Sequence, residues 1–209
     1  MLAMAPPTDQ IRIGPAHAQR RLVLLHGWGA DAHDLLDLGP LLVGADVGIV
    51  ALEAPLPHPA GLGRQWYDLQ QPNWPQLPAA RQALLTRLQA LASEVPLPQT
   101  VVLGFSQGAA MALDVALSAA LPLAGLIACS GYPHPDWHPR SAPPAQPQKI
   151  LLTHGEQDPV VPFAASEELR RQLHAAGHST QLLSFSGGHT IDPAVIPAIG
   201  AFVEAAWRA

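Results

Sequence analysis

The sequence has a single cysteine, Cys129, and only 13% charged residues, about half the usual share. One cysteine excludes an intramolecular disulfide and any metal site built from several cysteines. The formal net charge is −5, and no run of Lys or Arg is present. The composition therefore gives no electrostatic reason to expect nucleic acid as a partner.

Long apolar runs are also missing. No uninterrupted apolar stretch is long enough to span a membrane, so we expect no stable membrane insertion. The first residues, Met1–Pro7, lack the charged region and apolar core of a signal peptide. We therefore expect a cytoplasmic protein, a monomer or a homodimer, with no cofactor and no metal.

Apolar residues make up 48% of the chain and occur in short runs that alternate with longer helical segments. This alternation predicts an α/β fold with a mostly parallel central sheet and helices on both faces. We expect residues 1–20 to form an N-terminal arm or edge hairpin and residues 21–209 to form one domain. The predicted strands are Arg21–His26, Val47–Ala51, Thr100–Phe105, Leu123–Cys129, Lys149–His154 and Thr180–Phe185. The predicted helices are Ala32–Leu42, Pro78–Val95, Gln107–Ala120, Phe163–Ala176 and Pro193–Trp207, and the Pro- and Gly-rich segments Ala54–Gly63 and Tyr132–Gln148 are predicted to be loops.

The segment Gly104-Phe105-Ser106-Gln107-Gly108 lies between a predicted strand and a predicted helix. In this setting the G-x-S-x-G pattern is typical of a nucleophile elbow, a strained turn that exposes a serine hydroxyl. The flanking glycines suit a turn with almost no room for Cβ atoms. The alternative is a glycine-rich turn with an ordinary capping serine.

A serine nucleophile needs a base and a group that orients the base. Asp158 and His189 each follow a predicted strand and occur in the chain order Ser, Asp, His. We therefore predict Ser106 as nucleophile, Asp158 as the orienting acid and His189 as the base. Three other acids remain as rivals to Asp158: Asp136, Glu156 and Asp192. Of these, Asp192 is more simply explained by an interaction with the start of the last helix.

The segment His26-Gly27-Trp28-Gly29 follows the first predicted strand. An oxyanion hole needs two backbone N–H groups, which in this arrangement come from the first strand-to-helix loop and from the residue after the nucleophile. We assign the two donors to Trp28 and Gln107.

The aromatic residue Trp66 has two interpretations, a packing anchor or a wall of the substrate pocket. We assign Trp66 and Val161 to the substrate pocket. His134 and His138 could be taken for a metal pair, but no third ligand with suitable spacing follows them, so we assign no metal. His154 ends a strand and is explained as a hydrogen-bonded structural histidine.

Five segments together resemble the phospholipase/carboxylesterase family of α/β-hydrolases, which includes acyl-protein thioesterases and small bacterial carboxylesterases. They are His26–Gly29, Arg64–Asp68, Gly104–Gly108, His154–Pro162 and Gly188-His189. The resemblance implies an α/β-hydrolase fold and the same triad and oxyanion donors. The sequence departs from the family pattern at two positions: Ala109 stands where a second glycine is typical, and Trp28 stands where a smaller aliphatic residue is common.

These patterns predict a serine hydrolase that cleaves carboxylic esters of small or medium acyl chains through an acyl-enzyme, with thioesters as a second substrate class. The expected partner is a small-molecule ester or thioester, or an acylated protein. Three alternatives stay open: a peptidase of the same fold, a non-catalytic ligand-binding protein on the same scaffold, and a lipase with interfacial activation, which usually needs an amphipathic lid. The Pro-rich segment Tyr132–Gln148 is a poor lid helix, so we expect a minimal lid and an open site.

Overall fold

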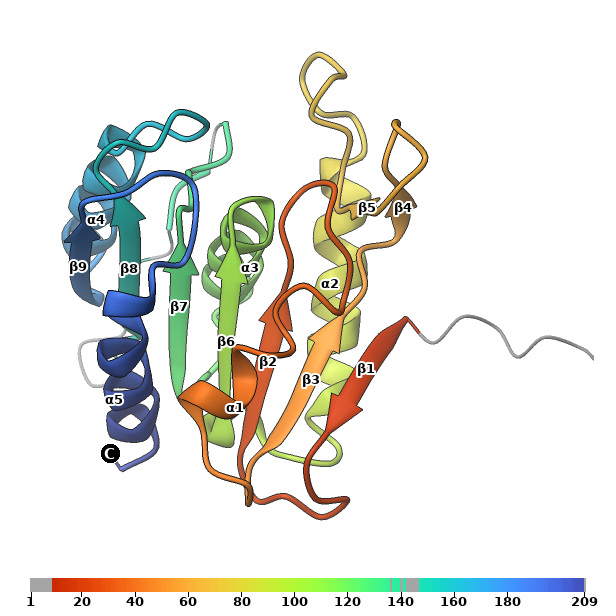
Figure 1. Ribbon diagram of the computed structural model, residues 1–209, viewed down its shortest axis with the longest axis vertical. Coiled ribbons are helices and arrows are strands. Elements are labelled where there is room, and N and C mark those ends of the chain that lie inside the picture. Colours follow the sequence, from red (N-terminus) through yellow and green to blue (C-terminus); the bar gives the residue numbers. More distant parts are fainter. Residues whose placement is uncertain (1–8, 136, 140, 142–146, 209) are drawn as a thin grey trace, which may run out of the picture.

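The computed structural model describes residues 9–135, 137–139, 141 and 147–208. A seven-stranded sheet of order β1-β3-β2-β6-β7-β8-β9 forms its centre (Figure 1). The strands are β1 Gln10–Ile13, β2 Arg21–Leu25, β3 Gly48–Leu52, β6 Thr100–Phe105, β7 Gly125–Cys129, β8 Lys149–Gly155 and β9 Ser179–Phe185. Neighbouring strands run parallel except for β1, which pairs antiparallel with β3 at one edge. The predicted mostly parallel sheet is confirmed.

Helices cover both faces of the sheet (Figure 1). The α-helices are α1 Gly39–Leu42, α2 Leu77–Leu91, α3 Gln107–Ser118, α4 Ala164–Ala175 and α5 Ile196–Trp207. Apolar residues of α2, α3 and α4 form one buried cluster with the sheet, and those of α1 and α5 form another. Because side chains alternate along a strand, Val23 and Leu25 of β2 join the first cluster while Leu22 and Leu24 join the second. No helix in the described part of the chain has both the length and the apolar character to cross a bilayer.

Several helix ends follow the residue chemistry of the sequence. Pro78 lies in the first turn of α2, where a missing N–H costs nothing. Gly177 follows the end of α4 with a φ of 85°, the left-handed conformation that favours glycine. The carboxylate of Asp192 accepts the N–H of Ala194 at 2.8 Å and caps the turn before α5. The expected interaction of Asp192 with the last helix is therefore confirmed.

The prediction of a helix over Ala32–Leu42 is wrong for its first seven residues, which form turns; only Gly39–Leu42 is α-helical. Backbone bonds here join residues three apart, for example from Asp34 N–H to Asp31 O at 3.2 Å. Side chains also take backbone donors: Asp31 accepts the N–H of His33, and Glu53 accepts the N–H of Ala32. Short polar side chains and a distant carboxylate thus compete with the helical pattern.

The prediction that Ala54–Gly63 is only a loop is also wrong. Two residues of it, Leu56–Pro57 (β4), pair antiparallel with Arg64–Gln65 (β5) to form a small hairpin above the sheet (Figure 1). Over the segment 132–148 the structure shows no helix or strand among its described residues. Asp136, the rival acid, lies outside the described residues.

Candidate active site

Ser106 occupies a strained turn between β6 and α3. Its φ is 52° and its ψ is −116°, a conformation that a non-glycine residue rarely adopts and that costs roughly 1–3 kcal/mol. The flanking glycines are required by close backbone contacts. A Cβ on Gly104 would lie 2.4 Å from the carbonyl oxygen of Gly108, and one on Gly108 would lie 2.2 Å from that of Leu25. The turn therefore has the geometry of a nucleophile elbow.

His189 joins the hydroxyl of Ser106 to the carboxylate of Asp158. Its Nδ1 lies 2.7 Å from Asp158 Oδ2, and its Nε2 lies 3.0 Å from Ser106 Oγ. An ionised carboxylate only accepts hydrogen bonds, so Nδ1 carries a proton and Nε2 of the neutral ring is free to accept the hydroxyl proton of Ser106. The side chain of Asp158 is fully buried and that of His189 is 17% exposed. The structure thus brings the three predicted side chains together in a hydrogen-bonded line.

The loops that carry Asp158 and His189 touch at Gly155, the last residue of β8. A Cβ there would lie 2.3 Å from the carbonyl oxygen of Gly188 and 2.4 Å from that of Gly187. The N–H of Gln157 donates to Gly187 O at 2.9 Å, which joins the two loops directly. Glycine at 155 is therefore what allows acid and base to approach.

Asp158 is held as a carboxylate by three hydrogen-bond donors. Burial acts to raise its pKa, but hydrogen bonds from His189 and from the N–H groups of Val161 and Val160 outweigh it, and the pKa falls below its ordinary value. Val160 and Val161 donate to Oδ1 at 2.8 and 2.9 Å. An ionised Asp158 is the form that stabilises an imidazolium at His189.

The loop after β2 lies directly beside the serine. A Cβ on Gly27 would lie 3.5 Å from the Cβ of Ser106. In the part of the chain that the structure describes, the backbone N–H groups of Trp28 and Gln107 have no protein acceptor. Two donors without partners flanking a nucleophile are what an oxyanion hole requires.

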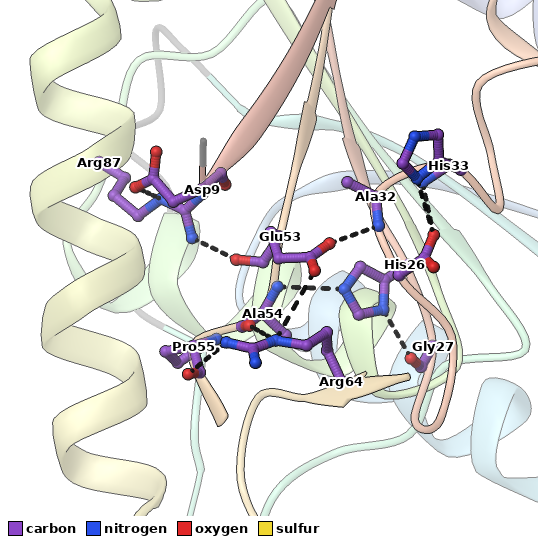
Figure 2. A network of polar contacts seen from close by, with 11 residues as sticks. Asp9, His26, Gly27, Ala32, His33, Glu53, Ala54, Pro55, Arg64 and Arg87 are labelled. Carbon is purple, nitrogen blue, oxygen red and sulfur yellow. Dashed lines mark hydrogen bonds and ion pairs between the residues drawn. The ribbon is translucent and has the colours of Figure 1, made fainter. Parts of the chain in front are cut away.

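Figure 2 shows the polar contacts that anchor this loop. Glu53, which follows β3, accepts the N–H of Ala32 at 2.7 Å and lies 3.7 Å from Arg64 Nε. Buried His26 donates from Nδ1 to Gly27 O at 2.8 Å and accepts the N–H of Ala54 at Nε2 at 3.1 Å. Burial lowers the pKa of His26, so its ring stays neutral and can both donate and accept.

The side chain of Trp28 is held against the β4–β5 hairpin. Its indole N–H donates to Gln65 Oε1 at 2.8 Å, and its ring packs edge-on against His58 at 4.1 Å between centroids. Backbone bonds from Gly29 N–H to Arg64 O and from Arg64 N–H to Ala30 O join the same two segments. The hairpin therefore supports the loop that carries the first predicted oxyanion donor.

The two predicted pocket residues are both buried. Trp66 is 1% exposed; its indole N–H donates to His26 O at 3.0 Å, and its backbone N–H donates to Gln107 Oε1 at 2.9 Å. Val161 is 7% exposed and lies on the loop that holds Asp158. The structure places both next to the catalytic loops, and their contact with substrate stays a prediction.

The remaining rivals lie apart from Ser106. The carboxylate of Glu156 accepts a bond from Ser184, and that of Asp192 caps the turn before α5. His138 is exposed, whereas His134 is buried. Among the described residues, no group of three or more His, Cys, Asp or Glu side chains is arranged to hold a metal ion.

Sequence reasoning missed a second buried polar network beside the site. His134 Nδ1 lies 2.5 Å from Asp114 Oδ2, its Nε2 lies 2.9 Å from the hydroxyl of Tyr67, and Arg81 pairs with Asp114. These contacts join α2, α3 and the segment after β7. Asp114 is the only polar residue in the stretch Gly108–Leu117, and that isolation is the signal that could have marked a buried charge.

The sheet order, the two helical layers and the elbow define an α/β-hydrolase. The model of the phospholipase/carboxylesterase family matches residues 8–207, and the chain belongs to that family. The esterase YpfH of Escherichia coli is 31% identical over 186 residues, which cover 84% of this chain and 78% of that protein. The acyl-protein thioesterase 1 of Neurospora crassa is 32% identical over 110 residues, covering 47% of this chain and 42% of that protein.

Solved structures agree on the fold. The crystal structure of esterase PE8 superposes with a TM-score of 0.81 at 30% identity, covering 94% of this chain and 96% of that one. The Bacillus cereus carboxylesterase superposes with a TM-score of 0.82 at 19% identity, which shows the fold alone.

The segments that match two fungal thioesterases, from Neurospora crassa and Eremothecium gossypii, span only about half the length of those relatives.

Proposed function

We propose that this protein is a serine hydrolase of carboxylic esters that works through an acyl-enzyme on Ser106. The observation that carries the proposal is the pair of hydrogen bonds made by His189, one to Asp158 and one to Ser106. The family and the relatives named esterase and thioesterase support the same reaction class. They do not favour a peptidase or a non-catalytic binding protein.

In the first half of the reaction, Ser106 Oγ attacks the carbonyl carbon of the ester as its proton passes to His189 Nε2. The backbone N–H groups of Trp28 and Gln107 donate to the oxyanion of the tetrahedral intermediate. The bond from the carbonyl carbon to the leaving oxygen then breaks, and His189 gives its proton to the departing alcohol. A thioester would release a thiol by the same route.

In the second half, water attacks the acyl carbon and its proton passes to His189 Nε2. The bond to Ser106 Oγ breaks, the carboxylic acid leaves, and His189 returns the proton to the serine. Asp158 keeps the proton of His189 on Nδ1 in the resting state and stabilises the imidazolium without itself becoming protonated.

We propose small or medium acyl chains as substrates, carried by a small-molecule ester or thioester, with an acylated protein as the larger alternative. Trp28 supports the preference for shorter chains, because this bulky residue stands where a smaller aliphatic residue is common in the family, and its indole is fixed to the β4–β5 hairpin. Rates on p-nitrophenyl esters from acetate to palmitate, with a matched thioester and an aminoacyl amide, test this. A maximum at or below medium chains is expected, and a maximum at palmitate or on the amide would contradict it.

The proposed nucleophile is tested by Ser106→Ala. We expect kcat on p-nitrophenyl butyrate to fall by about a thousandfold or more with the fold unchanged, because the acyl-enzyme cannot form. The matched control is Ser93→Ala, an exposed serine after α2, which should keep the full rate. Near-normal turnover by Ser106→Ala would overturn the proposal.

A further inference from the structure

The imidazole of His154 lies close to the carboxylate of Asp158, the proposed catalytic acid. His154 is the sixth residue of β8, its side chain is fully buried, and its Nε2 lies 3.2 Å from Asp158 Oδ2. This is the same oxygen that accepts the bond from His189. Oδ2 of Asp158 therefore lies close to two imidazoles, that of His189 and that of His154 in β8.

The proton positions on His154 follow from its neighbours. Its Nε2 lies 2.9 Å from the carbonyl oxygen of Val161, which can only accept, so Nε2 carries a proton. Its Nδ1 lies 2.7 Å from the hydroxyl of Ser166, which donates to Nδ1 when the ring is neutral. Ser166 lies in the first turn of α4 and is itself fully buried. The N–H of His154 is therefore donated to Val161 O, and the same nitrogen also lies 3.2 Å from Asp158 Oδ2.

The contacts of His154 and Val161 surround the carboxylate of Asp158. Val161 donates its N–H to Asp158 Oδ1 and accepts at its carbonyl from His154, while His154 also faces Asp158 Oδ2. Phe163 packs edge-on against the His154 ring at 5.8 Å between centroids. Oδ1 of Asp158 thus has two backbone donors, and Oδ2 has His189 as its hydrogen-bond partner and His154 in close contact. Rotation of the carboxylate away from His189 would break contacts on both sides.

We propose that His154 is a positioning residue for catalysis: it fixes the carboxylate of Asp158 at the angle that His189 requires, and Ser166 fixes His154. The inference rests on the proposed function of Asp158 and His189. It goes beyond that function by assigning a catalytic consequence to a buried histidine that touches neither substrate nor Ser106. Small errors in the position of a catalytic group cost large factors in rate, so loss of this contact should appear mainly in kcat.

The test compares two substitutions at one position. The amide nitrogen of glutamine is as many bonds from Cα as Nε2 of histidine, so His154→Gln can keep the donor to Val161 O beside Asp158, whereas His154→Leu removes it. We expect His154→Leu to lower kcat on p-nitrophenyl butyrate by about tenfold or more with KM within about twofold, and His154→Gln to stay within about threefold of the parent. The matched control is His174→Gln on α4, where Nε2 contacts the carbonyl of Thr180 outside the site; its rate should be unchanged.

A double-mutant cycle with Asp158→Asn separates positioning from general loss of structure. If His154 acts through the carboxylate, the effect of His154→Leu should vanish or reverse once Asp158 is an amide. All rates are compared at a temperature where thermal melts show each variant folded. Should His154→Leu not fold, Ser166→Ala takes its place in the cycle, because it removes the hydroxyl that fixes His154.

Three results would overturn the inference: a His154→Leu rate within twofold of the parent, equal losses in the Leu and Gln variants, or fully additive effects in the cycle. Failure of the proposed function is seen separately. In that case the parent protein itself would lack Ser106-dependent turnover and labelling by a fluorophosphonate.

Discussion

At the scale of single residues, the site depends on side chains that hydrogen bonds hold in place. Asp158 faces donors at both oxygens, and His189 contacts an acceptor at one nitrogen and a donor at the other. Ser106 is held in a left-handed conformation by glycines on either side that have no room for a Cβ. Because each group has one arrangement that satisfies its neighbours, the reactive geometry exists before substrate binds.

Asp158 also makes stability depend on pH. Its pKa in the folded protein lies below the ordinary value of 3.8, so the folded state gives up this proton at lower pH than the unfolded chain does. The resulting stabilisation is complete above the ordinary value and is lost as the pH falls through the lowered one. We expect the free energy of unfolding to drop less between pH 5 and pH 3 in Asp158→Asn than in the parent. Urea denaturation at both pH values measures this, and equal drops would contradict the account.

The sequence predicts these residues well where chain order and strand ends decide their position. Ser106, Asp158 and His189 each follow a parallel strand, and parallel strands end at one edge of a sheet, so their meeting could be predicted. The contacts of His154 could not, because they depend on a carbonyl seven residues away and on a serine in the next helix. Such contacts arise from packing, which has no local signature in the chain.

At the scale of elements, the β4–β5 hairpin is the main support of the loop after β2. Two backbone bonds and the Trp28–Gln65 contact join them, and Gly63 lies so close that a Cβ there would be 2.0 Å from the carbonyl oxygen of Gly29. The hairpin therefore controls where the N–H of Trp28 points.

Two glycines in the same hairpin provide a matched test. Gly63 and Gly61 both have positive φ, 74° and 82°, so alanine at either pays a similar backbone cost of about 1–2 kcal/mol. Only Gly63→Ala would push Gly29 away, since a Cβ on Gly61 meets nothing within 4 Å. We expect kcat to fall about tenfold or more in Gly63→Ala and to stay within about threefold in Gly61→Ala. Equal rates for the two variants would show that the hairpin does not position the oxyanion donor.

The elements themselves could be predicted in part. The six parallel strands and the helices α2 to α5 follow apolar periodicity and end signals, because each buries a regular face. The turns at residues 32–38 and the β4–β5 hairpin could not be predicted in the same way. In the turns, the backbone N–H groups of His33 and Ala32 are taken by Asp31 and by Glu53, the latter from a different strand end, so local pattern and observed conformation differ.

At the scale of the whole molecule, the two apolar layers share one sheet. Adjacent residues of β2 and of β6 belong to opposite clusters, so each cluster covers one face of the same strands. If either helical layer unfolded, the apolar side chains on that face of the sheet would be exposed. We propose on this basis that residues 21–209 form a single domain. Urea unfolding followed by far-UV circular dichroism and by tryptophan fluorescence should give coincident transitions. Two separated transitions would indicate independently stable parts and contradict the proposal.

The most direct test of the account is to trap the acyl group on the enzyme. Protein mixed with p-nitrophenyl butyrate, quenched in acid within milliseconds and digested, should yield one butyryl adduct, on the peptide that contains Ser106. His189→Ala should yield almost none in the same time, because the hydroxyl then lacks its base. A butyryl group found on another residue, or an adduct that forms as fast without His189, would contradict the central claim.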